Sequence, residues 1–378
     1  MKHMTLDYKN ASVQVSSFSK DGGVSEYHMM VHASGEGTFR QQVDALHAAF
    51  DAAAGQICAC ARPVFVRYFL SDVANQTEAL DRMLDGRWEC AVSTVGQPPL
   101  DGSKIAMWAY LVSCEAPSER DGLWSFDYLG HRHLWMGNGF GLGPDSEQQT
   151  YMIMDKFADA LAAEGCDIPN HCLRTWFFVH DVDHNYAGVV KGRRERFDSM
   201  GLTKETHYLA STGIAGNNPV CGSYVALDAY AAAGMPAEKV TYLKGATHLN
   251  PTHEYGVTFE RGTAVDYDDR RHVIISGTAS IDNKGQIVHP GDIRLQTHRM
   301  WENVEVLLAE AGASYGDVMH MIVYLRDVAD YACVRAMYEE RFPDHPKVFV
   351  WAPVCRPGWL IEMECIAVCH PERSEGSL

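Results

Sequence analysis

The sequence predicts an α+β protein built from three tandem units, each a mixed β-sheet with two helices on one face. One observation is an apolar, β-like run that ends in x-Asp-Val and occurs three times, with its aspartates at Asp72, Asp181 and Asp327. A second is a Gln that opens an amphipathic helix 30, 32 or 31 residues before each aspartate, at Gln42, Gln149 and Gln296. Because self-similarity at a near-constant spacing is typical of repeat architectures, we expect three copies of one supersecondary unit.

The first helix of each unit follows two or three β-like runs. In the third unit, apolar side chains recur at i, i+4, i+7 and i+8, at positions Met300, Val304, Leu307 and Leu308. This spacing places them on one face of a helix, as a helix that covers a sheet requires.

A second helix follows each repeated aspartate, and two β-like runs then close each unit. These helices are expected at Asn75–Leu84, Asn185–Met200 and Asp330–Phe342. A sheet covered by helices on one face must bury its other face, and three equivalent units can do so against each other around a pseudo-threefold axis. The alternative is an ordinary α/β protein, in which similar strings recur without equivalence.

The repeat divides the chain into three units and a tail. We expect a degenerate unit at 1–120, a second unit with its linker at 121–254, a third unit that carries the site at 255–370, and a flexible tail at 371–378. The covalent pseudo-trimer is expected to be a monomer or a low-order homo-oligomer.

Charge and hydropathy exclude two classes of partner. The 378 residues carry a formal net charge of −17, and a field of that sign repels nucleic-acid backbones and anionic lipid surfaces. No apolar run approaches 18 residues, and the start MKHMTLDYKN lacks the apolar region of a secretion signal. We therefore expect a cytoplasmic protein that binds neither nucleic acid nor a membrane.

The sequence predicts no metal site and no cofactor. The eleven cysteines are irregularly spaced and contain no C-x-x-C pair, so we expect buried small hydrophobes with an occasional functional thiol. His248 and His253 lack the order of a zinc helix, and Pro251 between them forbids a regular helix. The glycines of GNGFGLG precede an acidic helix start and are expected to form a turn rather than a nucleotide cradle.

The third unit resembles the RidA (YjgF) superfamily over about 100 residues, from VIISGTASID to the closing strand ending in IEMECIAV. The resemblance is carried by the Ser276-Gly277 turn, Gly-Asp-Ile before the Gln helix, Asn303 within it, the VYLRD strand, and the closing Arg and Glu-x-Glu. It implies a chorismate-mutase-like trimer with active sites between subunits. The segment VCRPGWLIE is more similar to chorismatases, closest to those that form 3-hydroxybenzoate, than to the small deaminases.

The closing strands of the third unit offer a cation and a carboxylic acid close together. Arg356 ends one segment, while Glu362 and Glu364 lie on the next strand at i and i+2 and therefore share a face. A carboxyl group within an apolar strand is desolvated, which raises its pKa toward the range of a general acid. Arg356 supplies a planar fork for a substrate carboxylate. The alternatives are an ion pair or a hydrogen-bonded strand carboxylate for the acids and a surface salt bridge for Arg356.

Further candidates surround this pair. The small residues Gly277, Thr278 and Ala279 allow a ligand to approach the backbone, although an ordinary tight turn has the same composition. Cys355 matches a cysteine that the resemblance places in chorismatases, and a buried structural thiol is the alternative. Polar contacts from the middle unit and the linker are expected at Arg174, Tyr255 and Arg261, with structural roles as the alternative.

Three functions remain open, all directed at a small anionic metabolite. The first is a chorismatase-like hydrolase that releases pyruvate from the enolpyruvyl ether of chorismate or a related cyclic acid, with Glu362 as acid and Arg356 as carboxylate clamp. The second is a RidA-like deaminase of enamino or imino acids. The third is a non-catalytic metabolite-binding protein. Since Gly96-Gln97 and Gly213-Ile214 stand where we place the counterparts of Arg356, at most one inter-unit cleft is expected to be complete.

Overall fold

The computed structural model describes residues 1–20, 24–57 and 60–371, and for Tyr255 its backbone alone. In this part of the chain three six-stranded sheets form, all with one topology. The predicted tail 371–378 lies, apart from Pro371, outside the described residues, as does Cys58.

The first sheet has the strand order β1-β2-β3-β6-β4-β5, in which the β4–β5 pair is parallel and the other pairs are antiparallel. Its elements are β1 (Lys2–Tyr8), β2 (Ala11–Ser19), β3 (Ser25–Ala33), α1 (Phe39–Ile57), β4 (Arg62–Leu70), α2 (Val73–Leu84), β5 (Ala91–Val95) and β6 (Ile105–Val112).

The second sheet repeats this order as β7-β8-β9-β12-β10-β11. Its elements are β7 (Ser118–Arg120), β8 (Leu123–Tyr128), β9 (His131–Phe140), α3 (Ser146–Ala163), α4 (Ile168–His171), β10 (Cys172–Val179), α5 (Val182–Ser199), β11 (Ala210–Ala215) and β12 (Val225–Ala233).

The third sheet repeats it again as β13-β14-β15-β18-β16-β17. Its elements are η1 (Ala237–Lys239), β13 (Val240–Leu243), η2 (Thr252–Tyr255), β14 (Gly262–Asp266), β15 (Arg271–Ala279), α6 (Ile293–Glu310), η3 (Tyr315–Asp317), β16 (Val318–Leu325), η4 (Val328–Asp330), α7 (Tyr331–Arg341), β17 (Lys347–Trp351) and β18 (Ile361–Cys369).

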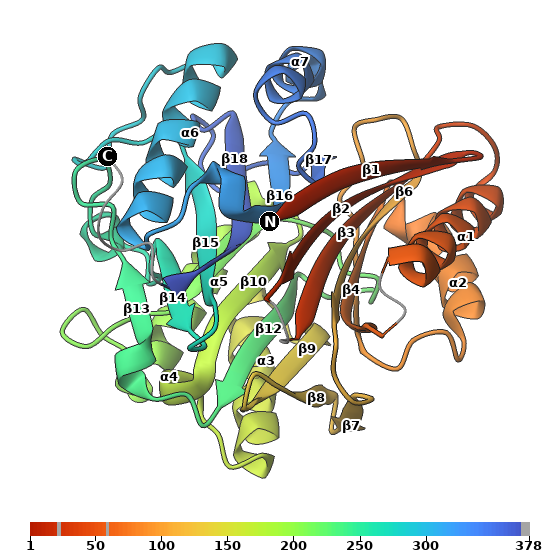
Figure 1. The fold of residues 1–378 in the computed structure, drawn as a ribbon. Coiled ribbons are helices and arrows are strands. Elements are labelled where there is room, and N and C mark those ends of the chain that lie inside the picture. Colours follow the sequence, from red (N-terminus) through yellow and green to blue (C-terminus); the bar gives the residue numbers. More distant parts are fainter. Residues whose placement is uncertain (21–23, 58–59, 372–378) are drawn as a thin grey trace.

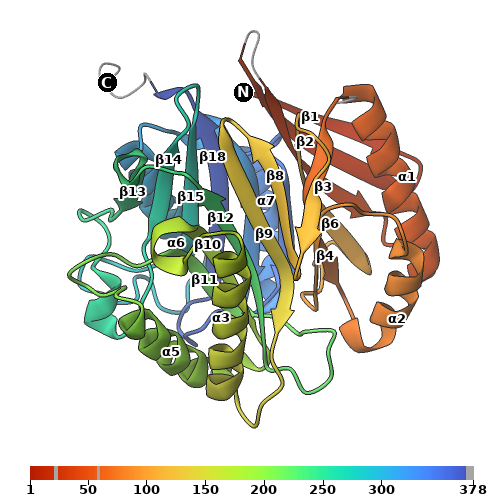
Figure 2. The same cartoon turned by 90° about the horizontal axis from the view of Figure 1, so that it is seen from below.

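The helices lie on the outside of the molecule and the three sheets face its interior. Helices α1 and α2 cover the first sheet on one side, α3 and α5 cover the second, and α6 and α7 cover the third (Figures 1 and 2). This arrangement confirms the predicted α+β pseudo-trimer, because each sheet buries its helix-free face against the other two.

The repeated glutamines have one structural role in all three units. Each side chain is buried near the start of its helix and accepts a hydrogen bond from the backbone N–H of the residue before the last strand of its unit. The donors are Lys104 to Gln42 at 2.7 Å, Tyr224 to Gln149 at 2.6 Å and Leu360 to Gln296 at 3.0 Å. The amide thus ties the first helix to the entry of the closing strand, which is why the residue recurs at constant spacing.

The repeated aspartates end a strand and begin the next helical segment. Asp72 accepts the backbone N–H of Asn75 as the N-cap of α2, and Asp327 accepts that of Ala329. Asp181 departs from this pattern, since it has a left-handed backbone and makes no side-chain cap. In two of the three copies the motif therefore satisfies a backbone donor that the first turn of a helix leaves open.

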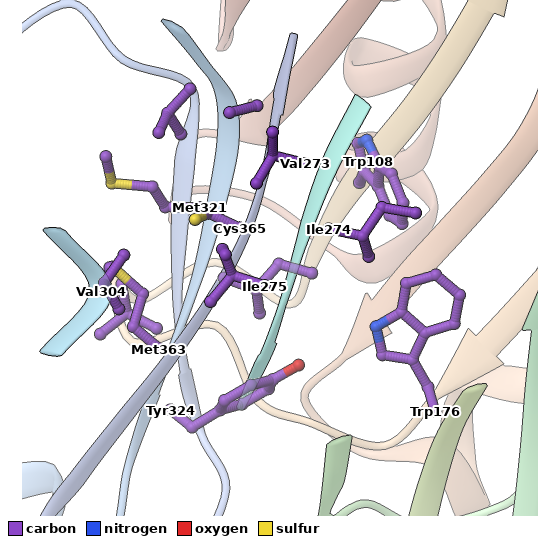
Figure 3. Packing of buried hydrophobic residues seen from close by; sticks show 14 of the residues in the cluster. Trp108, Trp176, Val273, Ile274, Ile275, Val304, Met321, Tyr324, Met363 and Cys365 are labelled. Atoms are coloured by element: carbon purple, nitrogen blue, oxygen red, sulfur yellow. The ribbon is translucent and has the colours of Figure 1, made fainter. Parts of the chain in front are cut away.

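Side chains on the strands of the third unit alternate between the two faces of its sheet, one toward the helices and one toward the other units. Val273 and Ile275 point to the helix side of β15, toward Met321, Cys365 and Met363, whereas Ile274 points to the opposite side, toward Trp108 and Trp176 of the other two units (Figure 3). Residues 362 and 364 alternate with Met363 and Cys365 on β18. Both predicted acids consequently face the centre of the pseudo-trimer.

The predicted unit boundaries remain a proposal, and two strands that lie before a boundary pair with the sheet of the unit after it. Residues 118–120 pair within the second sheet, and residues 240–243 pair within the third, although the predicted boundaries at 120/121 and 254/255 place them one unit earlier. Part of the predicted linker is therefore an edge strand. Among the described residues, no helix has the length and apolar character needed to cross a membrane.

Candidate active site

A cavity lies where the second unit meets the third. Strand β11 and helix α5 of the second unit form one wall. The other wall consists of the segment before β14, the end of β15, the segment between β17 and β18, and the start of β18. We call this cavity the acid cleft, because Glu362 lines it.

Glu362 is the acidic residue of the cleft and is 5% exposed. Burial, reinforced by the nearby Glu364 carboxylate, raises the pKa of Glu362 to about 8, although Arg174 and Arg261 oppose the shift. The carboxyl group is therefore protonated at neutral pH. A neutral carboxylic acid in a cleft is able to donate a proton to a substrate.

Three arginines line the same cavity. Arg193 from α5 and Arg261 from the segment before β14 are buried, and Arg356 is half-buried with its guanidinium 5.3 Å from the centre of the Trp359 ring. Arg193 donates to the hydroxyls of Thr258 and Ser211, and Arg261 donates to the backbone and side-chain oxygens of Asn250. The described lining thus contains three guanidinium groups and one carboxyl group, which suits a ligand with more than one carboxylate.

Gly277 decides where the acid lies. A Cβ atom at this position would lie 2.1 Å from Oε1 of Glu362, so any side chain there would displace the carboxyl group. The backbone of Gly277 belongs to an irregularity between Ile275 and Thr278 in the β15–β18 pairing. Glycine is thus required by the close approach of the acid rather than by a tight turn.

Cys355 and Tyr186 complete the wall beside the acid. Burial, together with the nearby Glu362, raises the pKa of the Cys355 thiol to about 12, while a hydrogen bond with Tyr186 acts in the opposite direction. The thiol is therefore protonated and not a nucleophile at neutral pH. Tyr186 lies over Gly213, where a Cβ atom would approach its ring to 2.7 Å.

Part of this chain is similar in sequence to proteins of a known family. The family model described as Endoribonuclease L-PSP matches residues 262–369. A RutC family protein of Pyrococcus abyssi is 39% identical over 97 residues, which are 25% of this chain and 76% of that protein. The 3-aminoacrylate deaminase RutC of Acinetobacter baylyi is 34% identical over 97 residues, or 25% of this chain and 77% of that protein.

The chain belongs to the RidA superfamily. Its overall fold extends beyond the single matched unit: a crystal structure of a chorismatase superposes with a TM-score of 0.63 at 17% identity, covering 81% of this chain and 93% of that one. The three-unit architecture is therefore shared with another protein, whereas the sequence similarity to the RutC proteins covers a quarter of the chain.

This RidA-superfamily chain brings most of the predicted site residues together. Glu362, Arg356, Cys355, Gly277, Ala279 and Arg261 all line the acid cleft. Two candidates lie elsewhere among the described residues. Thr278 pairs with Met363 and faces the helix side, where its hydroxyl donates to the carbonyl of Ser276. Arg174 is buried in an ion pair with Glu364, 2.7 Å away, and does not line the cleft. The side chain of Tyr255 lies outside what the structure describes.

Sequence reasoning missed the contribution of the second unit. Arg193 occupies the cationic position that the sequence assigned to Arg174, and Tyr186, Ser211 and Thr212 line the cleft beside it. Gly213 was predicted to be the second unit's counterpart of Arg356. It lies within β11 and lines the same cleft as Arg356. The run KGRRERF on a helix next to the repeated aspartate was the available signal, but an amphipathic pattern does not tell which arginine turns inward.

Proposed function

We propose that this protein is a chorismatase-like hydrolase that cleaves the enolpyruvyl ether of chorismate or a related cyclic carboxylic acid and releases pyruvate. The observation that carries the proposal is one buried carboxyl group, Glu362, whose pKa burial raises to about 8, in a cleft that three arginines line. A cyclic acid with an enolpyruvyl ether carries two carboxylates, so it makes use of more than one guanidinium. The likeness in fold to a chorismatase, which covers 81% of this chain, is consistent with this proposal.

The chemistry begins at the electron-rich double bond of the enol ether. Glu362 donates its proton to the terminal CH₂ carbon, and the π electrons form the new C–H bond and leave an oxocarbenium ion at the ether carbon. Water adds to that carbon and gives its proton to the Glu362 carboxylate. In the resulting hemiketal, the bond between the hemiketal carbon and the oxygen attached to the ring breaks. The proton of the hemiketal hydroxyl passes to that oxygen, so that the hydroxyl oxygen becomes the keto oxygen of pyruvate and the ring keeps its oxygen as an alcohol.

The arginines orient the substrate for this transfer. In the proposal, Arg356 binds the enolpyruvyl carboxylate, and Arg193 and Arg261 bind the ring carboxylate from the opposite wall. Holding the terminal carbon against the acid converts proton transfer into an intramolecular step. The neutral thiol of Cys355 borders the acid and contributes shape rather than charge.

A second candidate is deamination of a small enamino or imino acid, which uses the same protonation. It is favoured by the 34% identity to a protein described as 3-aminoacrylate deaminase RutC. Such a substrate has one carboxylate and therefore makes less use of a cleft that three arginines line. Binding without turnover is the third candidate.

Product analysis separates the three candidates. The purified protein is incubated with chorismate, and pyruvate is followed by a coupled reduction, while ammonia release is followed with an enamino acid generated in situ. We expect pyruvate with the wild type and a loss of about 10²- to 10⁴-fold in Glu362→Gln, because its amide cannot act as an acid. The matched control is Glu302→Gln, an exposed glutamate on α6, which should leave the rate unchanged. Ammonia without pyruvate would assign the deaminase instead, and chorismate binding without either product would assign a binding protein.

A further inference from the structure

The second acid of the closing strand, Glu364, is held by the other two units. Arg174 donates to its Oε2 at 2.7 Å, and Trp176 donates to its Oε1 at 2.7 Å. The guanidinium of Arg67, from the first unit, lies 3.9 Å from Oε1. Glu364 is 2% exposed, so both its oxygens are fixed in the interior by donors from β4 and β10.

Thr212 connects this carboxylate to the acid cleft. Its hydroxyl donates to Oε2 of Glu364 and accepts the backbone N–H of Gly277 at 2.9 Å, as well as a hydrogen bond from Arg174. A hydroxyl has one donor and two acceptor positions, so this one is fully used and its rotation is fixed. The chain of contacts runs from Glu364 through Thr212 to Gly277, over which Oε1 of Glu362 lies.

A neighbouring bond fixes the same backbone segment. The backbone N–H of Ser211 donates to the hydroxyl of Ser276 at 2.9 Å, and that hydroxyl donates to the carbonyl of Glu260 at 2.6 Å. Strand β11 of the second unit therefore sets the position of residues 276 and 277 in the third. The floor beneath the acid exists only when these two units are docked.

We propose that Glu364 is a positioning residue for Glu362: anchored by the second unit, its carboxylate fixes Thr212 and Gly277 beneath the acid and keeps a negative charge on the face of β18 that both acids share. This inference deepens the proposed function and rests on it for the role of the acid. Glu364 does not line the cleft and is not a catalytic residue. A negative charge on one carboxyl group disfavours ionisation of its neighbour, so Glu364 adds to the effect of burial, which is the larger cause of the raised pKa of Glu362.

The titratable groups around Glu362 come from four elements and two connecting segments, and all of them affect its ionisation. Arg174 on β10 and Arg261 before β14 favour its ionisation, whereas Glu364 on β18 and burial oppose it. The other titratable groups nearby are Arg193 and Tyr186 on α5, Arg356 and Cys355 between β17 and β18, and Tyr324 on β16. Because Glu364 carries the nearby negative charge, removing that charge should lower the pKa of Glu362 and so favour its ionised form.

The test measures Glu362 without relying on turnover. Protein labelled with ¹³C at the glutamate carboxyl is titrated by NMR, with the Glu362 signal assigned by its absence in Glu362→Gln. In Glu364→Gln we expect the titration midpoint of Glu362 to fall by about one pH unit, and the alkaline limb of kcat/KM for pyruvate release to move with it. In the matched control Trp176→Phe, which removes one donor to Glu364 but keeps its charge, the midpoint should stay at the wild-type value.

A charge-balanced variant separates electrostatics from structural damage. Glu364→Gln combined with Arg174→Gln removes both charges, so the midpoint should return toward that of the wild type. An unchanged midpoint in Glu364→Gln, or equal midpoints in the single and double variants, would overturn the proposal. If the protein releases no pyruvate but the midpoint shifts as expected, the proposed function fails while the positioning role stands.

Discussion

The acid cleft has a counterpart between the third unit and the first, with the same architecture and different chemistry. The counterpart cleft is larger and more open, and it is lined by β2, β3 and the segment before β6 on one side and by α7 and β17 on the other. The strand registers relate the two. Tyr324 pairs with Glu362 and Phe69 pairs with Ala106, and Tyr324 and Phe69 each lie three residues before the repeated aspartate. Ala106 therefore stands where the acid stands.

The cations of the acid cleft are also replaced in the counterpart. Gln14 occupies the position of Arg261 in the register, and Glu339 lies 12 residues after Asp327, as Arg193 lies 12 after Asp181. Asp101 follows the first unit's parallel strand pair as Arg356 follows the third's, and its carboxylate is hydrogen-bonded to Nδ1 of His32 at 3.2 Å. The lining of the counterpart thus combines Asp101 and Glu339 with Arg335 and Lys347, and it lacks the excess positive charge of the acid cleft.

The interface between the first and second units differs again. Ala226 pairs with Phe178 at the place of the acid, and the backbone there is packed so closely that a Cβ atom on Gly137 would lie 2.3 Å from the carbonyl oxygen of Val92. Three copies of one backbone therefore give one cleft with an acid and a cationic lining. The apolar pattern that holds each sheet is kept in every unit, because folding requires it three times, whereas the chemistry is required once.

Of the changes that distinguish the clefts, filling the space over Gly277 should have the largest effect on the activity of the acid cleft. Gly277→Ala places a methyl group against Oε1 of Glu362, and displacing an acid by about 1 Å costs on the order of 10²-fold in kcat/KM. Pyruvate release measures the loss. Gly55→Ala on α1, where a Cβ atom meets nothing within 4 Å, is the matched control and should keep full activity. Wild-type activity in Gly277→Ala would mean that the acid works from another position.

Removing one arginine from the acid cleft should lower the activity, whereas removing one from the counterpart cleft should not. Arg356→Ala should lower kcat/KM about 10- to 100-fold, the worth of a charge-assisted hydrogen bond, and Arg356→Lys should restore little because an ammonium lacks the planar fork. Arg335→Ala in the counterpart cleft should leave the rate of pyruvate release unchanged. Equal losses in the two variants would show that both clefts take part.

The pH dependence should follow the protonated form of Glu362. Because its pKa is raised to about 8, the acid form is complete at pH 6 and is lost as the pH rises through 8, so kcat/KM should fall about tenfold per pH unit above that value. The same shift affects stability. The native state holds this proton more tightly than the unfolded chain, so its contribution is full below the ordinary carboxyl value and is lost as the pH rises toward 8. Denaturant unfolding of wild type and Glu362→Gln at pH 5 and 8 should show a decline specific to the wild type.

Binding stoichiometry is the most direct comparison of the clefts and involves no loss of activity. Calorimetric titration of the inactive Glu362→Gln variant with chorismate should give one site per chain, since one cleft combines the three arginines. Arg356→Ala in this background should weaken that site. Three equivalent sites per chain would contradict the asymmetry of the clefts.

The sequence by itself determined the repeat and its local geometry. Each unit contains all the contacts that its apolar periodicity, its buried glutamine and its Asp-Val segment require. Spacing along the sequence was therefore enough to predict these features. The alternation of a strand likewise placed Glu362 and Glu364 on one face, and the apolar context of the strand predicted the raised pKa of Glu362.

Only the tertiary structure decided which side chains meet in the cleft. Arg193 and Glu362 lie in different units, and Arg174, which is on a buried strand, is drawn into an ion pair with Glu364 instead of the cleft. Several arginines have similar local sequence surroundings, and the packing of one sheet against another decides which of them reaches the cleft. The sequence therefore supplied the acid and one clamp, and the assembly of the three sheets supplied the rest of the site.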